Sequence, residues 1–138
     1  MSIFRSSSLV VFLTVSLLTT NVFSQVQTPR SVTINSDCGG FYEYLPAGYN
    51  TVGKTFPLLI FIHGIGEKGN GSTADLVKLL RHGPPKLIKN GTFPVSFKVN
   101  NQQFSFIVIS QQFSKWPTAE DVEDVEEQAN WFGMQILI

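Results

Sequence analysis

The sequence predicts an α/β fold, a sheet with parallel strands covered by helices, on three observations. Two short continuous apolar runs, 57–62 and 104–110, are typical of strands that are buried on both faces of a sheet. A helical pattern follows each run, and strands that alternate with helices pair in parallel through right-handed crossovers. Four glycines lie in residues 63–71, directly after the first run, which indicates a loop with unusual backbone angles or a close approach of another group.

Residues 1–24 predict a secretory signal peptide. Arg5 supplies a short positive region, Leu9–Leu18 is apolar, and small residues precede the expected cleavage between Ser24 and Gln25. The alternative, an uncleaved membrane anchor, is disfavoured because the apolar run is too short to span a bilayer. A secreted or periplasmic protein is therefore expected, with no stable membrane insertion after cleavage.

The remaining residues, 25–138, are enough for one small domain. Apolar residues make up 43% of the chain and charged residues 14%, a balance that argues against intrinsic disorder. The formal net charge is zero, which argues against a nucleic-acid-binding surface. The single cysteine, Cys38, cannot form an internal disulfide, and a small buried or turn-region thiol is favoured over a nucleophile.

The strands are expected in three places. Phe41–Leu45 alternates and is rich in aromatic residues, which predicts a strand ahead of the buried strand at 57–62. Phe104–Ser110 is the second strand of the buried type. Gln111–Pro117 is predicted to be the loop that follows it.

The first helix is expected to follow the glycine-rich loop. Ser72 or Thr73 can cap its N-terminus, and Asp75 lies three residues after Ser72, as in a capping box. Gly83 and the proline that follows it, Pro84, predict its end.

A second helix is expected from about Thr118. Its apolar face comprises Val122, Val125, Ala129 and Phe132. Its first turns carry four acidic residues, Glu120, Asp121, Glu123 and Asp124. A solvated helix N-terminus, where the helix dipole favours negative charge, explains this acidic run better than a metal or cation site does.

The loop that begins with His63 carries the chemistry of the chain. Acyl transfer needs backbone N–H donors aimed at the oxygen that becomes negative, and glycines let a loop present such donors without obstruction. The N–H of Ile65 is the best candidate donor, with Gly64 and Gly66 as its neighbours. His63 is predicted to order the loop by hydrogen bonding rather than to act as a base.

The chain resembles the secreted α/β-hydrolase superfamily, in the group of predicted peptidases, polyhydroxybutyrate-depolymerase-like esterases and phospholipase/carboxylesterase relatives. The resemblance spans residues 41 to 128 and is carried by Phe41–Tyr49, Pro57–Gly69, His82–Ile88, Phe106–Ser110 and Trp116–Pro117.

The resemblance implies an α/β-hydrolase-like doubly wound sheet. It also implies hydrolysis of a small-molecule or polymer carboxylic ester through an acyl-enzyme, by a Ser-His-Asp triad with no metal or cofactor. One oxyanion donor would come from the His63–Gly66 loop, and the other from the residue after the nucleophile.

The sequence departs from this family pattern in several ways. Gln111 stands where relatives tend to have proline, and no Gly-x-Ser-x-Gly nucleophile motif occurs, Gly71-Ser72 being the nearest approach. The acid and the late histidine are absent as well, because His82 precedes a helix stop and is predicted to serve helix termination or packing.

The fold is therefore expected to be truncated after the second helix, as in a truncated or frame-shifted gene product. The apolar stretch Met134–Ile138 would be an aggregation hazard unless it paired in a sheet. Two functions stay open: a secreted serine-hydrolase-family protein that acts on carboxylic esters, or a non-catalytic fragment or ligand-binding remnant that lacks the nucleophile.

Overall fold

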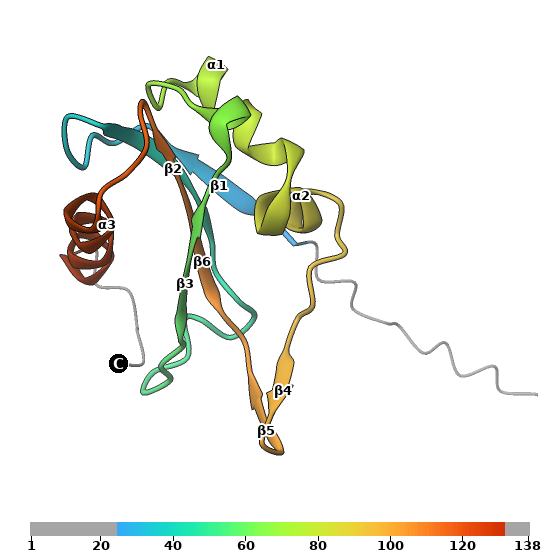
Figure 1. Cartoon of the computed structure of the whole chain (residues 1–138). Helices are drawn as coiled ribbons and strands as arrows, with labels where there is room; N and C mark the ends of the chain where they lie inside the picture. The colour runs from blue at the N-terminus through green and yellow to red at the C-terminus, as the bar shows by residue number, and fades with distance from the viewer. Residues whose placement is uncertain (1–24, 132–138) are drawn as a thin grey trace, which may run out of the picture.

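The computed structural model describes residues 25–131. The predicted signal peptide and the stretch Met134–Ile138 lie outside the described residues. The elements follow one another in the order shown in Figure 1: β1 (Gln27–Arg30), β2 (Cys38–Tyr44), β3 (Leu58–Ile62), the 3₁₀ turn η1 (Ile65–Glu67), α1 (Thr73–Leu76), the 3₁₀ helix η2 (Val77–Arg81), α2 (Gly83–Lys89), β4 (Phe97–Val99), β5 (Gln102–Phe104), β6 (Ile107–Phe113) and α3 (Ala119–Trp131).

The main sheet has the strand order β1-β2-β6-β3. β3 runs parallel to β6, as the α/β prediction requires, but β2 is antiparallel to both β6 and β1. The two strands predicted as the buried type, β3 and β6, are therefore parallel as expected, and the earlier strand β2 pairs antiparallel with β6. Parallel neighbours need a long crossover, and within the described sheet only the connection from β3 to β6 contains helices.

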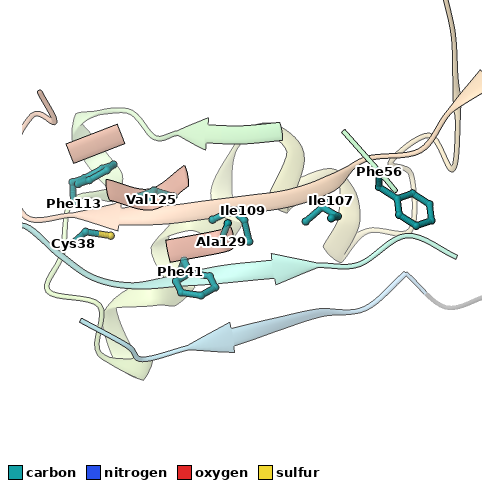
Figure 2. Close-up of a cluster of buried hydrophobic side chains, with 8 residues drawn as sticks. All are labelled: Cys38, Phe41, Phe56, Ile107, Ile109, Phe113, Val125 and Ala129. Atoms are coloured by element: carbon teal, nitrogen blue, oxygen red, sulfur yellow. The ribbon is translucent and has the colours of Figure 1, made fainter. Parts of the chain in front are cut away.

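Helices cover both faces of this sheet. On one face, Val125 and Ala129 of α3 pack in a cluster with β2 and β6 side chains such as Phe41 and Ile109 (Figure 2). On the other face, α1, η2 and α2 supply the buried partners: Leu76 and Leu79 pack with Tyr42, and Ile88 packs with Tyr44 and Val108. Neighbouring residues of β2 and β6 thus point to opposite faces, as the alternation of a strand demands. The mixed α/β architecture has two covered faces.

β3 is less buried than its sequence predicts. Leu58–Phe61 is only half-buried and Ile62 is 43% exposed, whereas every residue of β6 is buried. The expectation of burial on both faces was wrong for β3 because it is the outermost strand of the described sheet, with a neighbour on one side only. The central strand, β6, meets that expectation instead.

β6 also lies three residues later than predicted. Its C-terminal residues Gln111, Gln112 and Phe113 are fully buried, so the expected loop begins only at Ser114. These positions were predicted to belong to the loop, but the amide of Gln112 is buried against backbone groups that it satisfies.

The residues before β6 form a hairpin that the sequence reading missed. β4 and β5 pair antiparallel around the two-residue turn Asn100–Asn101. Both asparagines have positive φ, 48° and 64°, which a type I′ turn requires and which asparagine tolerates better than most residues.

The first predicted helix is divided into three pieces. Ser72 caps α1 by accepting a hydrogen bond from the N–H of Asp75 at 3.3 Å, but the Asp75 carboxylate accepts from Asn70 rather than closing the capping box. His82 adopts an extended conformation between η2 and α2. Gly83 and Pro84 then begin α2 instead of ending a helix, because the first turn of a helix needs no N–H from proline.

α3 begins where it was predicted, after Thr118. The Thr118 hydroxyl accepts from the N–H of Asp121, and the Asp121 carboxylate accepts from Thr118 in return. These hydrogen bonds hold the pKa of Asp121 below its usual range. The Asn35 amide bridges Asp121 to Asp124, so the acidic start of the helix is partly covered and not simply solvated.

The predicted apolar face of α3 faces the sheet. Val125 and Ala129 are buried and Val122 is half-buried, whereas Phe132 lies outside the described residues.

Cys38 is a buried thiol in the α3-side cluster, in agreement with the sequence prediction. Burial raises its pKa to about 11 from an ordinary 9.0. In the unfolded chain the thiol releases its proton first, so the folded state loses stability as the pH rises from the unfolded towards the folded pKa.

We therefore expect the free energy of unfolding to fall above about pH 9 by about 1.4 kcal/mol per pH unit more in the wild-type protein than in Cys38→Ala. Urea denaturation at several alkaline pH values measures this difference. Burial also raises the pKa values of Tyr42 and Tyr44. Both tyrosines are present in both proteins, so their contribution to the pH dependence cancels in the comparison. Equal slopes in the two proteins would contradict a raised pKa for the thiol.

Candidate functional site

The glycine-rich loop leaves β3 at its carboxyl end, where ligands of open α/β sheets bind. His63 is its first residue and is 3% exposed. His63 Nε2 accepts a hydrogen bond from the N–H of Phe113 at 3.0 Å, so Nδ1 carries the proton and donates to the carbonyl of Gly64 at 2.6 Å. Nε2 therefore ties the loop to the end of β6, Nδ1 holds the loop backbone at Gly64, and His63 orders the loop.

Gln112 is the second anchor of the loop. Its amide nitrogen donates to the carbonyls of Glu67 and Asp75, at 2.8 and 2.9 Å, and its amide oxygen accepts from the N–H of Gly71 at 3.1 Å. The next residue, Phe113, accepts from the N–H of Gly69 at 3.1 Å. The last two residues of β6 thus hold the loop at both of its ends and the start of α1. The sequence reading missed this role.

Two of the loop glycines are required by this packing. A Cβ at Gly69 would lie 2.6 Å from the Gln112 amide nitrogen. Gly71 has a φ of +77°, and a Cβ there would lie 1.9 Å from the backbone of Gly39 in β2. The close approach that the glycines indicated is therefore an approach of other parts of this chain. Gly66 differs, because a Cβ there would meet nothing within 4 Å.

The predicted donors lie together in the 3₁₀ turn η1. The N–H of Glu67 donates to the carbonyl of Gly64 at 3.1 Å and closes this turn. The N–H groups of Ile65 and Gly66 donate to no acceptor within residues 25–131. The Ile65 side chain is 66% exposed, so the turn faces solvent. Two neighbouring backbone donors at the end of a parallel strand can together bind a carbonyl oxygen or an anion.

The side chains of Glu67, Arg81 and His82 lie at the turn and were not predicted as site residues. Glu67 is 5% exposed, and its Oε1 lies 2.5 Å from Nδ1 of His82. Helix η2 ends just before His82, in agreement with the predicted helix termination, and the His82 ring pairs with Glu67 and makes no capping hydrogen bond to α2. Arg81 Nη1 donates to the carbonyl of Gly66 at 3.4 Å. The only signal for these contacts was the position of Arg81 and His82 just before a helix start.

Within residues 25–131, no serine, threonine or cysteine side chain is hydrogen-bonded to a histidine ring. His63 is engaged through both ring nitrogens, with Phe113 and Gly64, whereas His82 is engaged with Glu67 through Nδ1 alone. Ser72 caps α1, and Cys38 is fully buried. Within residues 25–131, no three His, Cys, Asp or Glu side chains are grouped so that they could hold a metal ion.

The chain matches no protein-family model and no curated protein. In the part of the chain from residue 25 to residue 131, no helix is both long and apolar enough to cross a membrane.

The anchoring by Gln112 can be tested with a substitution of similar volume. Gln112→Met leaves two carbonyls and one N–H without their partner, and we expect it to lower the free energy of unfolding by roughly 3 kcal/mol. Gln103→Met on the exposed surface of β5 is the matched control, with an expected effect within about 0.5 kcal/mol. Urea denaturation compares the two, and a similar small effect for both would show that Gln112 is not an anchor.

Proposed function

We propose that the turn at Ile65 and Gly66 is the oxyanion-binding part of a secreted or periplasmic ester hydrolase of the α/β-hydrolase type. The observation that carries the proposal is the pair of N–H groups without an acceptor, at the carboxyl end of β3 and on a turn held rigidly by β6. Donors that are fixed before the substrate arrives need no reorganisation when negative charge develops on the carbonyl oxygen, which is the property that acyl transfer requires.

The arrangement of the helices supports this proposal. The helices that join β3 to β6 and helix α3 cover opposite faces of the sheet. Right-handed crossovers on opposite faces run in opposite directions across a sheet. A parallel strand after α3 would accordingly lie against β3, at the edge that has no partner among the described strands. Its carboxyl end would lie beside the turn, where the family resemblance puts the nucleophile.

A second candidate function is the binding of an anionic or carbonyl ligand without catalysis. It is favoured by the absence of a Gly-x-Ser-x-Gly motif from the 138 residues, and because no serine, threonine or cysteine side chain of residues 25–131 is hydrogen-bonded to a histidine. The two functions share the same donors, so they differ in turnover and not in where the ligand binds.

The donor role is tested by two variants at Gly66. Gly66→Ala keeps the N–H, and its methyl group enters open space, whereas Gly66→Pro removes the N–H at a first-turn position that tolerates proline. We expect methylphosphonate, a tetrahedral anion like the acyl-transfer intermediate, to shift the amide resonances of Ile65 and Gly66 in a saturable NMR titration.

The alanine variant should retain this binding and the proline variant should lose it. The Gly69 amide, which is bonded to Phe113, serves as an internal control and should not move. Equal binding by the two variants, or shifts confined to other amides, would refute the donor role.

Turnover separates the two candidate functions for the chain as given. We expect no hydrolysis of p-nitrophenyl acetate above that of a denatured control, because the sequence has no nucleophile motif and no hydroxyl or thiol of residues 25–131 is hydrogen-bonded to a histidine. A spectrophotometric assay of the purified chain measures this directly. Clear activity that a serine-directed phosphonate abolishes would show that a serine of this chain is a nucleophile after all.

A further inference from the structure

A buried carboxylate belongs to the same turn as the two free donors. Glu67 is the last residue of the turn, and its side chain is 6% exposed. Its Oε2 lies 3.1 Å from the position that a Cβ of Gly64 would occupy, so the carboxylate folds back under the first residues of the turn. The two free N–H groups, of Ile65 and Gly66, lie between Gly64 and Glu67 in the chain.

A negative charge at this place opposes what the donors are proposed to do. An oxyanion that forms at the N–H groups of Ile65 and Gly66 would be repelled by an ionised Glu67, and at short range such repulsion is strong. The same carboxylate is nevertheless needed for shape, since it fills the space below the turn and accepts a hydrogen bond from His82. A binding turn built in this way requires positive charge close by.

Arg81, the last residue of η2, supplies that charge, and His82 follows it in the chain. The imidazole of His82 lies against Glu67 Oε1, and the guanidinium of Arg81, which is always charged, reaches the carbonyl of Gly66. The neighbouring Lys78 pairs with Asp75 at 2.6 Å and also donates to the carbonyl of Lys68.

We infer that Glu67, His82 and Arg81 are positioning residues that set the electrostatic potential at the Ile65 and Gly66 donors. Glu67 and His82 fix the turn from below, and Arg81 offsets the carboxylate from the side of Gly66. This inference rests on the proposed oxyanion-binding function, but it concerns the potential at two atoms of the free protein. Its test therefore does not depend on whether a ligand binds or an ester is cleaved.

Amide hydrogen exchange measures this potential. Hydroxide removes the amide proton and leaves an anion on the peptide group, so exchange of an open N–H is faster where the potential is more positive. The N–H groups of Ile65 and Gly66 are suitable because they have no acceptor in the described residues and exchange without opening of the fold.

We expect Glu67→Gln, which keeps the shape and an acceptor for His82, to speed exchange at both amides on the order of tenfold. Arg81→Gln should slow exchange at the same two amides by a similar factor. Lys98→Gln, a charge removed from the remote β4–β5 hairpin, is the matched control and should change neither rate. NMR exchange spectroscopy on the full chain gives all rates in one experiment.

The opposite signs distinguish an electrostatic role from a structural one. If Glu67 and Arg81 only held the turn in place, the two substitutions would not move the rates of these already open amides in opposite directions, and changes of the same sign in both variants would overturn the inference. Unchanged rates in both variants would overturn it equally. If the two variants change the exchange rates in opposite directions but the wild-type protein does not bind methylphosphonate, the result would count against the proposed function alone.

His82 has a conservative variant of its own. Asparagine keeps an N–H donor at the place of Nδ1, whereas alanine removes it. His82→Ala should speed exchange of the Glu67 N–H, which closes the turn by bonding to Gly64, and His82→Asn should restore the wild-type rate. A rate that is the same in all three proteins would remove His82 from the positioning set.

Discussion

The buried amide of Gln112 is the interaction on which the rest of the site depends. It bonds to Glu67, to Asp75 and to Gly71, and so joins the end of the central strand to the turn, to the first helix and to the loop segment that crosses β2. An amide buried here without these bonds would cost several kcal/mol. The glycines at positions 69 and 71 are the steric counterpart, because larger residues would separate the loop from β6 and β2.

This anchoring explains why two backbone donors remain free. Both ring nitrogens of His63 and every polar atom of the Gln112 amide are engaged in holding the loop. The 3₁₀ turn then closes with a single hydrogen bond from Glu67 to Gly64, which leaves the N–H groups before it unpaired in the described structure. A rigid support and unpaired donors together make the turn suited to a negative oxygen, and the neighbouring charges adjust how strongly it attracts one.

The sequence predicted those elements whose signal is local. The strand at β3, the start of α3 with its Thr118 cap, and the turn at His63–Gly66 all lie where hydrophobic runs, caps and glycines indicated. The end of β6 was not predictable in this way, because Gln112 looks like a loop residue until its backbone partners, up to 45 residues away in sequence, are known. Glu67 and His82 were missed for the same reason, since their contact forms only when the loop and the start of α2 meet.

The hydrogen bonds that hold the loop can be detected directly in NMR by the scalar couplings that they transmit. A coupling between the Gly69 amide nitrogen and the Phe113 carbonyl carbon should be present, as should one from the Gln112 side-chain amide to the Glu67 carbonyl carbon. The Ile65 and Gly66 amides should show none. Couplings from Ile65 or Gly66 to a carbonyl of this chain, with those of Gly69 and Gln112 absent, would contradict the account, because the loop would then be held by the very groups proposed to bind the oxyanion.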